Sequence, residues 1–268
     1  MLSLNESLAT QARAGLHKAQ FTARPAAFLV ATMLGGAFIG LADILMFTAA
    51  GPFFLAGHPA TALVQGLVFG IGLILVVFAG GELATSAMMA LPQAVGVRAL
   101  TWPRAASTLA LILVGNLLGC LVLALVVWGT GVFDAGTAPG DMLAAVAAGK
   151  AHKSTLALFT RGIMCNVLVC LAIWSQARTA HAVGKMLLMA WCLVAFVTSG
   201  FEHVVANMTT LSLAWLEGVE AVTLAEMARN YVVVGAGNLV GGAVFVGGAY
   251  LLVANRTAAA KELAEDVH

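Results

Sequence analysis

The sequence predicts an all-α integral membrane protein in which six transmembrane helices form an inverted repeat of three plus three, with the second and fifth helices broken. Three observations predict this class. Of the 268 residues, 61% are hydrophobic and 9% are charged, whereas a soluble domain carries about 25% charged residues. Six segments are apolar enough to cross a bilayer, and two short motifs recur in the same order along the chain.

The charge and cysteine content exclude several other classes. The 13 basic and 12 acidic residues leave a net charge of +1, so the chain offers no basic face for nucleic acid. The cysteines lie inside apolar runs, which suits packing better than disulfides. No Cys/His cluster has metal-ligand spacing, so no metal site is expected. The cysteines are Cys120, Cys165, Cys170 and Cys192.

The expected spans follow from length and hydropathy, because about 20 apolar residues of helix cross a bilayer core. Residues 1–24 form a polar, amphipathic segment ahead of the first span, and residues 25–255 hold the transmembrane domain. Residues 256–268 are expected as a C-terminal tail, solvated from Lys261 onward. The six expected spans are residues 26–47, 60–79, 105–127, 162–176, 185–198 with a continuation to 216, and 230–253.

The distribution of basic residues predicts the orientation of the spans. With the N-terminus in the cytoplasm, the cytoplasmic segments hold nine basic residues and the opposite segments hold four. We therefore expect both termini in the cytoplasm. The nine are Arg13, Lys18, Arg24, Arg98, Arg104, Arg178, Lys185, Arg256 and Lys261, and the four are Lys150, Lys153, Arg161 and Arg229.

Two motifs indicate an internal repeat. The sequence GGE at 80–82 recurs as GFE at 200–202, and GNLLG at 115–119 recurs as GNLVG at 237–241, with offsets of 120 and 122 residues. Each copy holds three spans, and an odd number places the two copies in opposite orientations. Many transporter folds use such an inverted repeat to build a site near the membrane midplane.

The second and fifth spans are interrupted at corresponding places by glycine followed by a glutamate. Backbone freed from helical bonding in a membrane must be satisfied by protein or by water in a cavity, so paired breaks indicate a substrate path. Kinks for close helix packing are the alternative. Glu82 and Glu202 would repel an anion, and we expect them to accept free N–H groups and so fix the loops.

His203 is the one histidine that lies deep in a span. Such a histidine is often a neutral packing residue, but this one follows a helix break, next to Glu202. A neutral imidazole can donate a hydrogen bond to an anion, and an imidazolium can pass it a proton. Either lowers the cost of moving a small anion through an apolar constriction. Thr85, at the matching break, either supplies a hydroxyl facing His203 or caps its helix.

Other side chains fit the same path or have ordinary structural roles. Lys150 and Lys153 could form a positive mouth that concentrates anions, or could reach the membrane interface. Asn166, inside the fourth span, offers amide hydrogen bonds without charge. Four apolar side chains near the breaks could form gates or simply pack: Phe69, Leu73, Leu83 and Phe196.

Three stretches of the chain resemble the formate/nitrite transporter family: GGELATS at 80–86, RGIMCNVLVCLA at 161–172 and SGFEHVVANM at 199–208. The resemblance extends from about Leu16 to Asn255. It implies a homopentamer of aquaporin-like protomers in a bacterial inner (cytoplasmic) membrane. Each protomer would have its own pore for small monovalent anions such as formate, nitrite or hydrosulfide, without a cofactor.

The resemblance also implies roles for particular residues. A positive vestibule would draw in the anion, which the central histidine would then hydrogen-bond or protonate between two apolar slits. His203 falls on the pore histidine, Thr85 on the threonine opposite, Asn166 on the pore asparagine and Lys150 on the vestibule lysine. The outer constriction falls on Phe69 and Phe196, and the inner constriction on Leu73 and Leu83.

The branch of the family is indicated by the sequence after Met208. The formate branch usually has a proline a few residues on, whereas this chain continues TTLS at 209–212 and has no proline beyond Pro139. The chain is therefore more similar to the nitrite branch. It departs from the usual pattern at 84–87, and Asp43 in the first span has no counterpart role, so we interpret it as structural, at the pore or at a protomer contact.

We therefore expect a nitrite channel or transporter rather than an enzyme, with formate and hydrosulfide as alternatives. A neutral-solute pore of the aquaporin type is disfavoured, because no proline follows any asparagine. A haem-binding redox subunit would need two histidines at membrane depth, and a membrane hydrolase would need a nucleophile–base pair.

Overall fold

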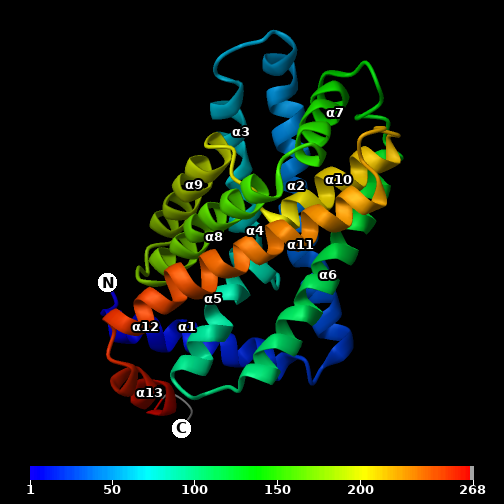
Figure 1. Cartoon of the computed structure of the whole chain (residues 1–268). Coiled ribbons are helices and arrows are strands. Elements are labelled where there is room, and N and C mark those ends of the chain that lie inside the picture. Colours follow the sequence, from blue (N-terminus) through cyan, green and yellow to red (C-terminus); the bar gives the residue numbers. More distant parts are fainter. Residues whose placement is uncertain (266–268) are drawn as a thin grey trace.

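Every regular element of the described residues, 1–265, is a helix in this computed structural model (Figure 1). Helices satisfy their own backbone groups, which an apolar segment needs in a bilayer. The final three residues of the expected tail, 266–268, lie outside the described residues. The all-α prediction is confirmed for the rest of the chain.

Six spans are present in residues 1–265, as predicted. Five helical stretches are long and apolar enough to cross a membrane. The remaining span, the fifth in chain order, consists of two shorter apolar helices. The five are Pro25–Leu55 (α2), Thr61–Gly80, Trp102–Trp128 (α6), Thr155–Ala177 (α8) and Leu224–Val253, and the two shorter helices are Ala182–Thr198 (α9) and Val204–Leu216 (α10).

Two of these spans contain π-helical turns. The second is built from α3 (Thr61–Phe69), α4 (Ile71–Leu75) and the π-helix η1 (Val76–Gly80). The last is built from α11 (Leu224–Val240), the π-helix η2 (Gly241–Gly248) and α12 (Ala249–Val253). π-Helical turns often occur at functional sites, and η1 ends at the first predicted break. The remaining helices are α1 (Leu4–Phe21), α5 (Ala84–Gly96), α7 (Ala138–Ala151) and α13 (Arg256–Glu265).

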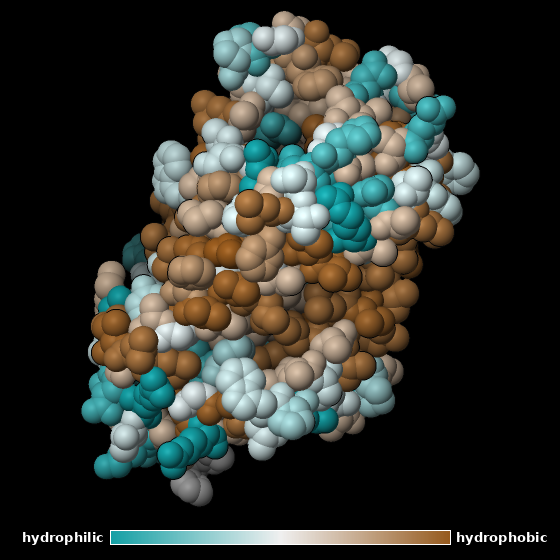
Figure 2. Space-filling model, viewed as in Figure 1, coloured by the Kyte–Doolittle hydropathy of each residue, from teal (hydrophilic) through white to brown (hydrophobic). Residues whose placement is uncertain are grey.

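The surface matches a bilayer. Figure 2 shows hydrophobic residues across the middle of the viewed face and hydrophilic residues gathered towards its two ends. Large apolar side chains of α6 are among the exposed ones, with Val114 56% and Leu125 53% exposed. Helices α1 and α13 lie at one end of the molecule and α7 lies at the other (Figure 1). The first and last described helices therefore lie at the same end of the molecule.

The second and fifth spans are broken where the sequence predicts. α5 follows the break after Gly80, and α10 follows the break after Gly200. Gly80 has φ 86° and Gly200 has φ 69°, a left-handed conformation that residues with a Cβ adopt only at a cost. The repeated glycine therefore ends a helix in each half of the molecule, and a short extended segment starts each half-helix, α5 and α10.

An asparagine holds the first break loop. Asn116 of α6 donates from Nδ2 to the carbonyl oxygens of Glu82 and Thr32, each at 2.7 Å, and its Oδ1 accepts from the backbone N–H of Ala84 at 2.9 Å. One fully buried side chain thus satisfies a carbonyl and an N–H of the break loop and ties that loop to α2 through the carbonyl of Thr32.

The second break loop is held in the same way. Asn238 of α11 donates from Nδ2 to the carbonyl oxygens of Gly162 at 2.7 Å and Glu202 at 3.0 Å, and its Oδ1 accepts from the N–H of Val204 at 2.9 Å. Asn116 and Asn238 are the asparagines of the repeated GNLxG motif. The two repeat signals of the sequence therefore belong to one structural device, which is made twice.

Helix α1 lies along one end of the bundle and contacts α5 and α13. The segment expected as a solvated tail is helical up to Glu265, which corrects that expectation. Ala259 and Leu263 of α13, four residues apart, are buried, and the N–H of Asn255 bonds to Asn5 Oδ1 at 2.9 Å. The apolar pair on one face of the helix packs against α1 and removes that face from water.

Replacing Asn238 by alanine should destabilise the protein strongly. The substitution leaves a buried N–H and two buried carbonyl groups without their partner, which we expect to cost about 2–4 kcal/mol. Thermal unfolding of the protein in detergent measures this loss.

The control is Asn255→Ala, at an exposed asparagine that caps α13 and whose loss should cost about 1 kcal/mol. If the melting temperature of Asn238→Ala equals that of Asn255→Ala, the asparagine does not hold the break loop.

Candidate functional site

The N-termini of the two half-helices meet in the interior of the molecule. Thr85, in the first turn of α5, and His203, the N-cap residue of α10, approach each other with Oγ1 and Nε2 3.0 Å apart. Both side chains are buried. A helix N-terminus carries free N–H groups and partial positive charge, which favour an anion. Two such termini therefore face one point, at the interface of the repeats.

The hydrogen bonds of His203 fix its orientation and its tautomer. The ring nitrogen Nδ1 accepts from the backbone N–H of Ala206 at 3.1 Å, so a neutral ring carries its proton on Nε2. That proton points toward Thr85. The ring of Phe196 stacks on the imidazole with centroids 6.0 Å apart. His203 thus offers one N–H donor toward the centre of the molecule.

An outer cavity of about 90 Å³ leads to the histidine. Its walls include Lys150 of α7, His203, and the rings of Phe69 and Phe196. These two rings pack edge to face with centroids 5.6 Å apart, and both also border the central chamber beneath them. The two rings therefore lie between the outer cavity and the central chamber, and their role as the outer constriction stays a prediction of the resemblance.

The central chamber is contracted in this structure, with about 0 Å³ for a water molecule. His203 lines it together with Leu73 and Leu83, which are almost completely buried. An inner cavity of about 230 Å³ begins beyond them, next to Gly81 and Ser86. The predicted inner pair thus lines the closed chamber with the histidine, and residues close to it in sequence, such as Val76 and Gly81, line the inner cavity.

A cluster of opposite charges lies at the outer cavity. Glu202, 3% exposed, accepts hydrogen bonds on Oε2 from Lys150 Nζ at 2.7 Å and from Asn207 Nδ2 at 2.9 Å. Lys153 Nζ lies 3.7 Å from its other oxygen. Burial lowers the pKa of Lys153 below its ordinary 10.5, and the charge of Glu202 partly offsets this. The predicted positive mouth is therefore two lysines around one buried carboxylate.

The inner cavity has a matching pair that the sequence did not reveal. Lys18 of α1 lines this cavity and pairs with Glu82. Lys18 precedes the first span, 64 residues away from its partner, so no local pattern connects them. The internal repeat could have indicated this pair. Because Glu82 is the counterpart of Glu202 in an inverted repeat, a lysine partner for Glu202 implies a basic partner for Glu82 at the opposite end of the molecule.

The expected role of the two glutamates is wrong in its detail. Within residues 1–265, hydrogen bonds to the carboxylates of Glu82 and Glu202 come from lysines and from Asn207, not from helix N–H groups. Asn116 and Asn238 satisfy the loops instead, because an amide can accept and donate at once. A carboxylate only accepts, so it could not also bond the free carbonyls.

Asn166 braces the site from behind rather than lining it. Its Nδ2 donates to the carbonyl oxygens of Thr85 at 3.1 Å and Asn238 at 2.7 Å, and the side chain is fully buried. Neither the outer cavity, the central chamber nor the inner cavity includes it. Asn166 thus connects α5, which carries Thr85, to Asn238, which holds the loop before α10.

Asp43, which the sequence left without a clear place, lies at the outer cavity. It is 2% exposed and lines the cavity with Lys150 and His203. Its Oδ2 accepts a hydrogen bond from the hydroxyl of Thr210 at 2.8 Å. The carboxyl group therefore faces the path and not a protomer contact.

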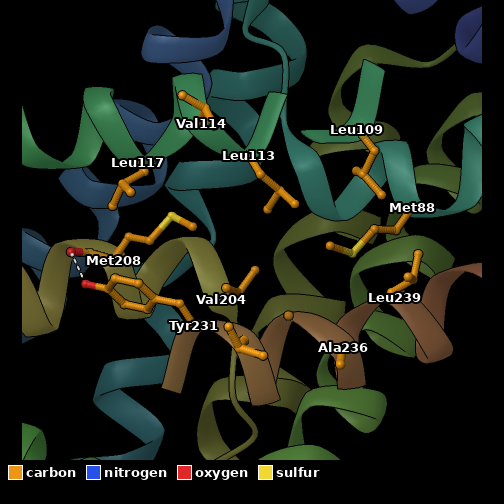
Figure 3. A pocket seen from close by; sticks show the side chains of 12 residues that line it. Met88, Leu109, Leu113, Val114, Leu117, Val204, Met208, Tyr231, Ala236 and Leu239 are labelled. Atoms are coloured by element: carbon orange, nitrogen blue, oxygen red, sulfur yellow. Dashed lines mark hydrogen bonds between the residues drawn. The ribbon is translucent and has the colours of Figure 1, made fainter. Parts of the chain in front are cut away.

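A larger apolar hollow lies away from this path. It has a volume of about 380 Å³ and lies between α6 and α11, bordered by leucines of α6 and by Tyr231 of α11 (Figure 3). It shares no residue with the cavities at His203. An apolar wall cannot stabilise a charge, so the anion-binding features belong to the path alone. In residues 1–265, no three His, Cys, Asp or Glu side chains come together as a metal site.

Replacing Lys150 by methionine should destabilise the protein by about 1–3 kcal/mol, because Glu202 then stays buried without its strongest hydrogen-bond donor. Denaturant or thermal unfolding in detergent measures the loss. The double variant Lys150→Met with Glu202→Gln should recover part of it, because no unpaired charge remains. A double variant that is as unstable as the sum of the two single changes would show that the pair does not act as a unit.

Comparison with known proteins places the chain among membrane transport proteins. The profile of a family described as formate/nitrite transporter matches residues 5–252. The chain is 39% identical over 230 residues to the nitrite transporter NirC of Escherichia coli (strain K12), covering 84% of this chain and 83% of that protein. It is 38% identical over 227 residues to the formate channel BtFdhC of Bacillus thuringiensis, covering 84% and 85%.

Two solved structures share the fold. An FNT family ion channel superposes with a TM-score of 0.87 and 36% sequence identity, covering 93% of this chain and 99% of that one. A pentameric formate channel with formate bound has a TM-score of 0.73 and 29% identity, covering 84% and 95%. The predicted fold and the predicted resemblance are both confirmed.

Proposed function

This chain belongs to the formate/nitrite transporter family, and on that premise we propose that it is a pore for small monovalent weak-acid anions, with nitrite as its main substrate. The family consists of transporters and channels and not of enzymes, as expected from the sequence. The observation that carries the proposal is the meeting of Thr85 and His203 between two half-helix N-termini. A single N–H donor and two positive helix ends form a site for one small anion.

The outer lysines begin the path. Lys150 and Lys153 outnumber the buried Glu202, so their field draws an anion into the outer cavity. The rings of Phe69 and Phe196 then exclude the hydration shell, because a closed aromatic pair offers no hydrogen bonds. An anion can pass them only if a group beyond them replaces the lost water.

His203 supplies that group. Its Nε2–H faces Thr85 in this structure. When an anion arrives, this group donates its hydrogen bond to the anion instead and stabilises the negative charge. When the ring of His203 has first taken up a proton, the imidazolium can pass it to nitrite and return to the neutral imidazole, and the nitrous acid so formed crosses the leucine slit at far lower cost. Leu73 and Leu83 then separate the site from the inner cavity, where Lys18 receives the anion.

We propose nitrite rather than formate because of the sequence after Met208, which has no proline and reads TTLS at 209–212. The relatives do not separate the two anions, because a nitrite transporter and a formate channel are 39% and 38% identical to this chain. Formate and hydrosulfide remain alternative substrates of the same path. All three are small monovalent anions that become neutral on gaining one proton.

We extend the proposal to assembly and membrane. The solved formate channel described as pentameric covers most of this chain, and we infer a homopentamer in which each protomer keeps its own path. The chain is a multi-pass membrane protein of a bacterial family. The excess of basic residues at the ends that carry α1 and α13 supports the inner (cytoplasmic) membrane with both termini in the cytoplasm.

His203→Phe should lower nitrite flux by about 10–100-fold, because it removes the Nε2–H donor of the site, and a hydrogen bond to a charged group is worth about 1.5–3 kcal/mol. His203→Asn keeps a donor and loses proton exchange, so it should retain flux but change its pH dependence. Flux of nitrite, formate and hydrosulfide into proteoliposomes over a pH series measures both effects.

The matched control is His152→Asn, an exposed histidine at the end of α7. It should behave as the unchanged protein does. Unchanged rates and an unchanged pH response in both His203 variants would overturn the role given to this residue. Osmotic swelling without any anion flux would favour a neutral-solute pore instead.

A further inference from the structure

An acidic side chain, Asp43, lines the outer cavity itself, in addition to the nearby carboxylate of Glu202 that the lysines surround. Asp43 projects from α2 into the cavity that holds Lys150, His203 and the ring of Phe69. It lies within a membrane-spanning helix and is 2% exposed. An ionisable group at such a place is costly to keep and is usually functional. The feature to explain is why a buried carboxyl group lines this cavity.

The partners of Asp43 do not neutralise it. Its hydrogen bond within the described residues comes from the hydroxyl of Thr210 at 2.8 Å, which is a neutral donor. Within residues 1–265, Asp43 has no ion-pair partner within 4.0 Å. The two lysines nearby are taken by Glu202. A buried carboxylate with one neutral donor is poorly compensated and exchanges a proton readily.

The elements that pack against this part of α2 bring few other charges. α3 contributes Gln65 and Phe69, which carry none. Lys150 and Glu202 act on the carboxyl group with opposite signs. The titratable groups around it are Lys150 from α7, Lys153 behind it, Glu202 and His203 before α10, and the thiol of Cys120 from α6.

The charge around the outer cavity therefore depends on one proton. Among the groups that line the cavity, Lys150 is the cation and Asp43 the acid, beside the imidazole of His203. With Asp43 protonated and His203 neutral, the lining keeps the positive charge of Lys150, and with Asp43 ionised these two charges balance. An anion meets an attractive wall in the first case, and in the second it meets a cavity with no net charge and a carboxylate facing it.

We propose that Asp43 is a proton-dependent selectivity residue of the outer cavity, which admits monovalent anions toward His203 when protonated and excludes them when ionised. The proton stays on the carboxyl group while the anion passes, so no bond forms or breaks in the anion. Thr210 stabilises the ionised state through its hydroxyl and thereby helps to set the pH at which admission stops. This inference rests on the proposed function as an anion pore and gives its outer side a pH response of its own.

The first test is nitrite flux into proteoliposomes with equal pH on both sides, from pH 5 to pH 8, after subtraction of flux into empty liposomes. Asp43→Asn should match the unchanged protein at pH 5 and exceed it by about tenfold at pH 8, the size expected from removing one unit charge from a partly hydrated wall. Thr210→Val should move the decline in flux to higher pH. Comparison between variants cancels the titration of nitrite itself.

The control is Asp134→Asn, an exposed aspartate before α7 that does not line the cavity. It should follow the profile of the unchanged protein. The inference is overturned if Asp43→Asn shows the same pH profile as the unchanged protein, or if its flux falls by one factor at every pH, as a purely structural role would produce.

A second measurement does not depend on transport. Infrared difference spectra of the unchanged protein minus Asp43→Asn should contain the carbonyl band of a protonated carboxyl group at pH 5, and this band should disappear as the pH rises. A carboxyl group that does not titrate in this range contradicts the inference even if nitrite flux is normal. Absence of anion flux in the unchanged protein, with a titrating band, would instead remove the proposed function and leave the proton exchange of Asp43 in place.

Discussion

The need to satisfy backbone groups inside a bilayer governs this structure. Two spans are broken in the membrane, and each break frees N–H and carbonyl groups that lipid cannot bond. Asn116 and Asn238 each accept from one N–H of a break loop and donate to one carbonyl of that loop and to one carbonyl of a neighbouring helix. Because the loops are held in this way, the two half-helices can direct their N-termini to the same interior point. The positive potential at that point is a direct consequence of the breaks.

A site with this potential still needs entrances that attract an anion and a centre that excludes water. Partly buried lysine–glutamate pairs at both cavities place ammonium groups at the walls, with Lys150 at one cavity and Lys18 at the other. Apolar side chains close the centre around His203. The inverted repeat explains why both halves share this plan, although the lysines themselves come from segments outside the repeated motifs.

The sequence predicted the fold in detail and the site only in part. Span positions, the broken helices and the repeat followed from hydropathy, glycine and the two recurring motifs. Phe69, Phe196, Leu73, Leu83 and His203 line one closed chamber, and the pore roles that the resemblance implies for them stay predictions. The partners could not be predicted, because pairs such as Lys18 with Glu82 and Asp43 with Thr210 join distant segments. Asn166 was misplaced for a similar reason: its buried amide serves two backbone carbonyls, which no sequence pattern distinguishes from lining a pore.

The central claim is that the Nε2–H of His203 meets the anion. Solid-state NMR of the protein in lipid, with 15N-labelled histidine, tests it most directly. Because Nδ1 is held by the N–H of Ala206, saturating nitrite should shift the Nε2 resonance of His203 and leave its Nδ1 resonance nearly unchanged. Identical histidine spectra with and without nitrite, under conditions in which nitrite flux is measured, would contradict the claim.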